Sequence, residues 1–154
     1  MWVQAVLRFP FLSLLALVTF SPVLCGSERF ETFSYGDHPR QNLDVLSPRG
    51  SDKAPVVIFV HGGGWIHGNK SLYHPVQSRL AGEGIVTVSI NYRLCPEVTF
   101  PEFVEDGAKA VKWTVQHIDR HGGDPDNVFL MGHSAGGHTV ALLGLDERYL
   151  EEVG

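Results

Sequence analysis

The clearest chemical signal in the chain is the pentapeptide GHSAG at residues 132–136, which matches the pattern G-x-S-x-G. The apolar run VFLM precedes it and the segment AGGHTVALLGL begins within it, so we expect a strand before Ser134 and a helix after it. In such a tight turn, glycine two residues to either side of the serine avoids a backbone collision, and the hydroxyl is exposed beside a helix N-terminus. The pattern therefore predicts Ser134 as a nucleophile; the alternative is an idle serine in a glycine-rich turn.

A second glycine-rich motif, HGGGW at residues 61–65, directly follows the β-branched run PVVIFV. It begins 73 residues before Ser134, which leaves room for one strand and two helices. The segment NYRLCPE at 91–97 lies between the two motifs, and GDPD at 123–126 leads into the strand before the serine. Over about residues 35–150 these motifs together resemble the hormone-sensitive-lipase-like branch of the α/β-hydrolase superfamily. The resemblance extends to carbohydrate esterases acting on acylated plant polysaccharides and to kynurenine-formamidase-like amidases.

The resemblance implies an oxyanion hole. In the family, backbone N–H groups of the glycine loop converge with that of the residue after the serine, which assigns this role to Gly63, Gly64 and Ala135. Such donors stabilise the tetrahedral oxyanion of acyl transfer. By the same resemblance His61 supports the loop and is not the catalytic base. Trp65 is expected either beside the acyl pocket or in the core.

The residues after Ser134 do not supply the catalytic partners that a serine nucleophile needs. A serine nucleophile needs a base, and the base needs an orienting acid. In this superfamily they follow the serine in the order Asp or Glu, then His. The 20 residues after Ser134 contain one histidine, His138, and four carboxylates, all on or just after the same predicted helix. We therefore expect a chain truncated before the catalytic acid and histidine, with an unpaired apolar edge on the strand at 127–131.

A glycine-rich loop after a strand is also typical of nucleotide sites, and the nearby histidines could suggest a metal site. The residue spacing in this sequence fits neither kind of site. A dinucleotide fingerprint needs a third glycine where His67 stands, and a P-loop lysine is displaced because Asn69 intrudes before Lys70. The histidines lack the H-E-x-x-H spacing of a zinc site, and the cysteines form no C-x-x-C. We therefore expect no cofactor and no metal.

The elements that must position these motifs alternate along the chain. Continuous apolar runs predict strands buried on both faces, and apolar spacings of three and four predict helices. The expected strands are 30–35, 42–46, 55–61, 85–90 and 127–131, and the expected helices are 71–82, 101–121 and 135–145. This order predicts an α/β fold, the N-terminal half of an α/β-hydrolase with its C-terminal strands missing, in which helices cover both faces of a mostly parallel sheet. The first two strands would form an antiparallel pair at one edge.

The first 25 residues differ from the rest of the chain. Arg8 is the only charged residue before Glu28, and the apolar run between them, followed by small residues around Cys25, is typical of a secretory signal peptide. We expect a signal peptide at 1–25, a truncated α/β-hydrolase domain at 26–154, and a secreted or periplasmic protein; an uncleaved membrane anchor is the alternative. The net charge of −5 gives no reason to expect nucleic acid or an anionic membrane as a partner, and the oligomeric state stays open.

These observations predict a serine hydrolase that cleaves small-molecule carboxylic esters through an acyl-enzyme. A kynurenine-formamidase-like amidase is the alternative enzyme, although a secretion signal favours an external ester over an intracellular formamide. A non-catalytic binding module and an inactive fragment are the alternatives from other classes, because a fold does not by itself specify a function.

Overall fold

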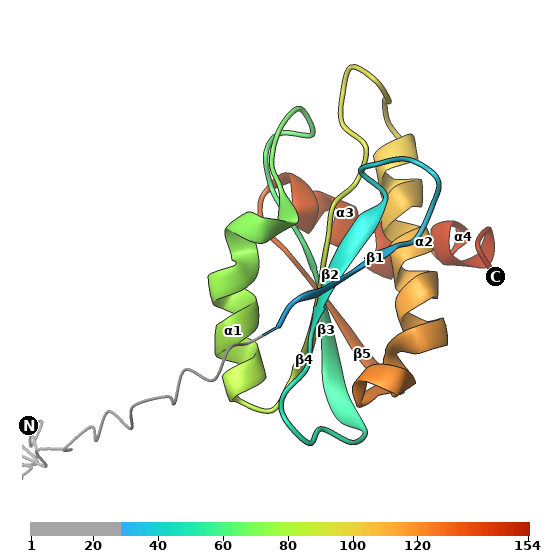
Figure 1. The fold of residues 1–154 in the computed structure, drawn as a ribbon. Helices are drawn as coiled ribbons and strands as arrows, with labels where there is room; N and C mark the ends of the chain where they lie inside the picture. The colour runs from blue at the N-terminus through green and yellow to red at the C-terminus, as the bar shows by residue number, and fades with distance from the viewer. Residues whose placement is uncertain (1–28) are drawn as a thin grey trace, which may run out of the picture.

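Residues 29–154 are the part of the chain that the structure, a computed structural model, describes (Figure 1). The signal peptide expected at residues 1–25 lies outside the described residues and stays a prediction. Within residues 29–154, none of the helices combines the length and the apolar character needed to cross a membrane.

A five-stranded sheet forms the centre of the fold. Its strands are β1 (Glu31–Ser34), β2 (Asn42–Leu46), β3 (Ala54–Val60), β4 (Val86–Ile90) and β5 (Gly123–Gly132). Their spatial order is β1-β2-β4-β3-β5, in which β3 pairs in parallel with β4 and β5, and β2 pairs antiparallel with β1 and β4. The predicted antiparallel pair at one edge of the sheet is therefore confirmed.

Helices cover both faces of this sheet, as the alternating sequence pattern predicts. They are η1 (Lys70–Tyr73), α1 (His74–Gly82), α2 (Glu102–His117), η2 (Ile118–His121), α3 (Ala135–Leu145) and α4 (Arg148–Glu151). Helix α1 packs against β2 and β4 on one face, and α2 lies on the opposite side of the sheet (Figure 1). Helix α3 lies on the same face as α2 and contacts it. The two helices pack closely at Gly107 of α2, where a side chain would meet Thr139 and Leu143 of α3. The hydrophobic core lies mainly between the sheet and these two helices.

Two of the predicted helices are divided. The helix expected at 71–82 begins as the 3-10 turn η1, and α1 starts only at His74, with Pro75 in its first turn, where a missing N–H has no cost. The helix expected at 101–121 is α-helical to His117 and continues as η2, after which Gly122 ends it in a left-handed conformation with φ of 75°. The short helix α4 was not predicted, because a single turn rich in charged residues carries no apolar periodicity.

Strand β5 differs from the prediction in its burial. A strand buried on both faces was expected at 127–131, and this is wrong: Phe129 is 56% exposed and Met131 is 44% exposed. Within the described residues β5 pairs only with β3, so it lies at the edge of the sheet, beyond the strands that α1 covers. Val128 and Leu130, on the other face, pack against the core. The apolar edge strand is therefore confirmed in the described residues, and such an edge favours strand-to-strand association.

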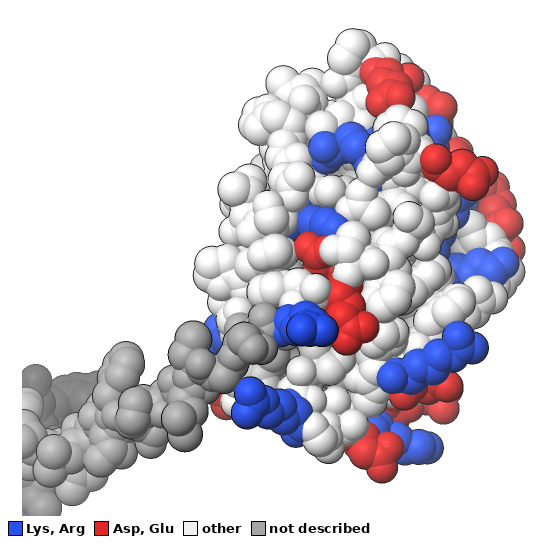
Figure 2. Space-filling view, viewed as in Figure 1, with Lys and Arg blue, Asp and Glu red and all other residues white. Residues whose placement is uncertain are grey.

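Charged side chains of both signs are interspersed on the face of the molecule seen in Figure 2. Two surface pairs are Arg79 with Glu83 and Arg148 with Asp146, each at 2.7 Å. Exposed pairs of this kind contribute little to stability. This view therefore shows no uniformly basic surface.

Candidate active site

Ser134 lies exposed in the turn between β5 and α3. Its φ of 52° and ψ of −117° are values that a non-glycine residue rarely adopts, so the turn is strained. The flanking glycines are sterically required: a Cβ on Gly132 would collide with the Gly136 backbone, and a Cβ on Gly136 would collide with the carbonyl oxygens of Val60 and His61. The predicted strand–turn–helix around the serine is therefore confirmed.

The glycine loop at residues 61–68 lies directly against this turn. Strands β3 and β5 are parallel neighbours, so the loop after β3 and the turn after β5 leave the same edge of the sheet. A Cβ on Gly62 would lie only 2.8 Å from the carbonyl oxygen of His133 and 3.2 Å from the Cβ of Ser134. The fold thus brings into contact two motifs that are far apart in the sequence.

The three residues expected to form an oxyanion hole carry N–H groups without backbone partners. Gly63 and Gly64 have φ values of 134° and 59°, which favour glycine. Within residues 29–154, neither of their N–H groups makes a backbone hydrogen bond. Ala135 is the first residue of α3, so its N–H has no acceptor inside the helix. These donors are available to a ligand, and their convergence on one oxygen stays a prediction.

His61 is fully buried and holds the loop together. Its ring stacks on Tyr92 with centroids 4.3 Å apart, and the Tyr92 hydroxyl donates to the His61 carbonyl oxygen at 2.9 Å. His61 Nδ1 lies 2.7 Å from the Gly62 carbonyl, which can only accept, and Nε2 lies 3.4 Å from Nη2 of Arg40, which can only donate. The ring is therefore neutral with its proton on Nδ1, and burial lowers its pKa to about 4. Both ring nitrogens of His61 contact groups that hold the glycine loop in place, which agrees with the supporting role expected for this residue.

We expect the His61 ring to stay neutral down to about pH 4, because a second ring proton would point at the Arg40 guanidinium in a buried site. Its side-chain ¹⁵N shifts, measured by NMR, should not change between about pH 7.5 and about pH 5, a range in which a histidine peptide titrates. Because the folded-state pKa lies below the unfolded value of 6.5, the associated stability is complete above pH 6.5 and is lost as the pH falls toward about 4. Titration of His61 near pH 6.5 would contradict this placement.

A buried carboxylate, Asp106, ties helix α2 to the segment after β4, and sequence reasoning did not identify this role. Asp106 accepts from Arg93 Nη2 at 2.7 Å, from the Arg93 N–H at 2.9 Å and from Gln41 Nε2 at 2.7 Å. Burial raises its pKa, but these hydrogen bonds outweigh burial and hold the pKa below its usual 3.8. The available signal was helical spacing, since Asp106 falls on the same face as Phe103 and Ala110, both of which are buried.

A second buried ion pair anchors the far end of the glycine loop. The ammonium group of Lys70 lies 2.6 Å from the carboxylate of Asp44 on β2, and His74 Nε2 contacts the same carboxylate at 2.9 Å. Arg40 donates to the Gly68 carbonyl at 3.0 Å. The loop is therefore fastened to the sheet where it ends as well as where it begins.

Trp65 packs against the hydrophobic core, where it stacks on Phe103 with centroids 5.6 Å apart. Trp65 is half-buried and lies against the edge of the core, a position that agrees with the core alternative without deciding it. Its ring also meets His138 edge-on at 5.3 Å, and His138 follows Ser134 by one helical turn on α3. A place for Trp65 beside an acyl group stays a prediction.

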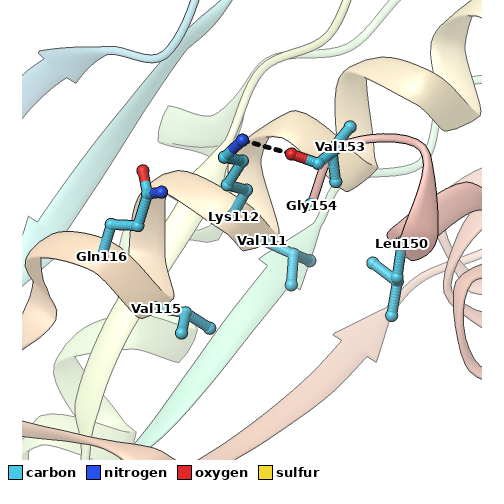
Figure 3. Close-up of a pocket in the computed structure, with 7 residues that line it drawn as sticks. All are labelled: Val111, Lys112, Val115, Gln116, Leu150, Val153 and Gly154. Atoms are coloured by element: carbon cyan, nitrogen blue, oxygen red, sulfur yellow. Dashed lines mark hydrogen bonds between the residues drawn. The ribbon is translucent and has the colours of Figure 1, made fainter.

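A pocket of about 170 Å³ lies apart from both motifs, between α2 and the C-terminal residues (Figure 3). It is lined by Val111, Lys112, Val115, Gln116, Leu150, Val153 and Gly154. Lys112 donates to the Val153 carbonyl across it (Figure 3). Neither the glycine loop nor the serine turn lines this pocket. Separately, no three His, Cys, Asp or Glu side chains in residues 29–154 are grouped so that they could hold a metal ion.

Sequence comparisons connect this geometry to known proteins. A family model described as BD-FAE matches residues 43–152. The chain is 39% identical over 145 residues to Esterase LipC of Mycobacterium tuberculosis, which covers 86% of this chain and 36% of LipC. It is 37% identical over 118 residues to isoprenylcysteine alpha-carbonyl methylesterase ICME of Arabidopsis thaliana, which covers 76% of this chain and 28% of that protein. The chain therefore spans about a third of the length of these relatives.

Structural comparison gives the same fold. The Pyrobaculum calidifontis esterase matches with a TM-score of 0.69 and 34% identity, over 79% of this chain and 41% of that protein. Over the aligned residues, the chain therefore has the same fold as this esterase, a mostly parallel sheet with helices on both faces. This confirms the fold class expected from the sequence.

Proposed function

The chain belongs to the BD-FAE family, and from this premise we propose that Ser134 is the nucleophile of a serine hydrolase that cleaves small-molecule carboxylic esters. The relatives named above are an esterase and a methylesterase, which supports this chemistry. The observation that carries the proposal is the contact of Gly62 with the turn that holds Ser134. It sets a loop with free N–H groups beside an exposed, strained serine, which is the combination that acyl transfer needs.

In the proposed reaction, the Ser134 hydroxyl oxygen attacks the ester carbonyl carbon while its proton passes to a base. The carbonyl oxygen becomes an oxyanion that the N–H groups of Gly63, Gly64 and Ala135 stabilise. The bond to the alcohol then breaks, and the alcohol leaves with the proton held by the base. Water then attacks the carbonyl carbon of the acyl-enzyme while the base takes its proton. The bond to the Ser134 oxygen breaks, the acid leaves, and the base returns the proton to Ser134.

We propose that the base lies outside these 154 residues. The histidines near the serine have other contacts: His61 holds the loop, His133 Nδ1 lies 3.0 Å from the Tyr73 hydroxyl, and His138 packs against Trp65. The family resemblance puts the acid and the histidine later in the sequence than Ser134. The coverage of about a third of each relative is consistent with this.

Labelling with a fluorophosphonate tests the proposal, because the oxygen of an activated serine attacks the phosphorus atom, fluoride leaves, and the serine becomes a phosphonate ester. We expect slow labelling of the chain, visible as a mass increase, and none in Ser134→Ala. Hydrolysis of p-nitrophenyl acetate should be weak, since an oxyanion hole without a base retains only part of the catalytic power.

The outcomes separate the alternatives. Turnover equal to that of a complete esterase would overturn the proposal that the base is external. A chain that is folded by circular dichroism and remains unlabelled would instead favour a non-catalytic binding module. Labelling that persists in Ser134→Ala would remove Ser134 from the mechanism.

A further inference from the structure

We propose that the hydroxyl group of Tyr73 is a positioning group that holds the glycine loop and the serine turn together; this rests on the proposed function. Tyr73 ends η1, directly before α1, and belongs to neither motif. The Gly62 N–H donates to its oxygen at 3.3 Å, and the same oxygen lies 3.0 Å from His133 Nδ1. Gly62 directly precedes the expected oxyanion donors, and His133 directly precedes Ser134.

The hydrogen-bond roles are compatible with one another. The Gly62 N–H can only donate, so the Tyr73 oxygen accepts there and its own O–H is free to donate to His133 Nδ1. In this arrangement Nδ1 of His133 accepts the hydrogen bond. One hydroxyl thus satisfies a loop amide and orients the residue next to the nucleophile.

Tyr73 is suited to this role because its own position is fixed. Its ring packs on Phe59 of β3 with centroids 4.5 Å apart, and Phe59 is buried. The turn η1 is anchored at its start, where the Lys70 N–H donates to Asn91 Oδ1 at 2.8 Å and the Asn69 side chain accepts from the Ser71 N–H at 2.9 Å. The hydroxyl therefore projects from a rigid support.

No other side chain in residues 29–154 forms hydrogen bonds to both segments. Arg40 and Tyr92 bond only to the loop side, at Gly68 and His61. Thr139 bonds only to the serine side, at the Ala135 carbonyl. Among the side chains of the described residues, Tyr73 is therefore the one that links the loop to the serine turn through hydrogen bonds at both ends. Misplacement of reacting groups by about 1 Å can cost about 100-fold in rate, so a link between the two segments has kinetic consequences.

The test compares the chain with Tyr73→Phe, which keeps the ring on Phe59 and removes only the hydroxyl. Tyr149→Phe is the matched control, because Tyr149 lies on α4 and its hydroxyl makes no hydrogen bond within the described residues. We expect Tyr73→Phe to lower the limiting rate of fluorophosphonate labelling about tenfold, with the half-saturating reagent concentration unchanged. Hydrogen exchange should become faster in residues 61–68 and 132–136 together and stay unchanged in α2.

Two results would overturn the proposal: labelling and exchange in Tyr73→Phe that match Tyr149→Phe, or exchange that rises equally in α2, which would indicate a general loss of stability. If the unaltered chain is itself not labelled, the proposed function fails. The exchange measurement then decides separately whether Tyr73 joins the two segments, because it does not depend on the reactivity of Ser134.

Discussion

Replacing Gly62 with alanine is expected to slow the reaction of Ser134 with a fluorophosphonate by about 100-fold while the chain remains folded. The added methyl group would lie 2.8 Å from the His133 carbonyl oxygen and 3.2 Å from the Ser134 Cβ. The carbonyl belongs to the backbone of a strained turn, so it cannot move without moving the serine. The loop and the turn must therefore separate, which draws the N–H groups of Gly63 and Gly64 away from Ser134.

Gly144→Ala is the matched control for this substitution. Nothing lies within 4 Å of a Cβ at Gly144, which is a helical position on α3, so alanine is expected to be neutral or stabilising there. The labelling rate and the thermal midpoint of each variant are the measurements. A Gly62→Ala chain that labels at the rate of Gly144→Ala would show that the contact between the two motifs does not control reactivity.

Asp106→Ala is expected to lower the free energy of unfolding by about 3 kcal/mol, which is a large fraction of the stability of a small domain. Asp106 is fully buried, whereas the side chain of its partner Arg93 is 21% exposed. Its removal leaves the guanidinium, the Arg93 N–H and the Gln41 amide without their acceptor. Groups left unpaired in this way cost more than the hydrogen bonds themselves contribute.

Urea denaturation at neutral and acid pH measures this effect, with Glu83→Ala as the control. Glu83 forms an exposed pair with Arg79, so its loss should have no measurable effect. The folded-state pKa of Asp106 lies below 3.8, so its contribution is complete above that pH and is lost as the pH falls through the folded-state pKa. The difference between the chain and Asp106→Ala should therefore shrink in strong acid. Equal stability of the two at neutral pH would mean that the buried pair is not needed for folding.

The sequence by itself determined the features that depend on neighbouring residues. The helix 135–145 and the strand 42–46 have the predicted boundaries, because apolar spacing reports directly on local backbone geometry. The serine turn was equally readable, since a Cβ on Gly132 would collide with the backbone of Gly136 within the same five residues. The alternation of strands and helices was enough to specify the α/β class.

Only the tertiary structure decided what depends on the order of the strands. The pairing of β3 with β5 sets Gly62 against Ser134 and brings Tyr73 to His133, residues 60 positions apart. It also leaves Phe129 exposed on a strand whose composition predicts burial on both faces. A single residue's type carries no record of its distant neighbours, so hydrogen bonds such as that of Tyr73 follow from topology. The local sequence specified the serine turn, and the order of the strands specified which residues lie against it.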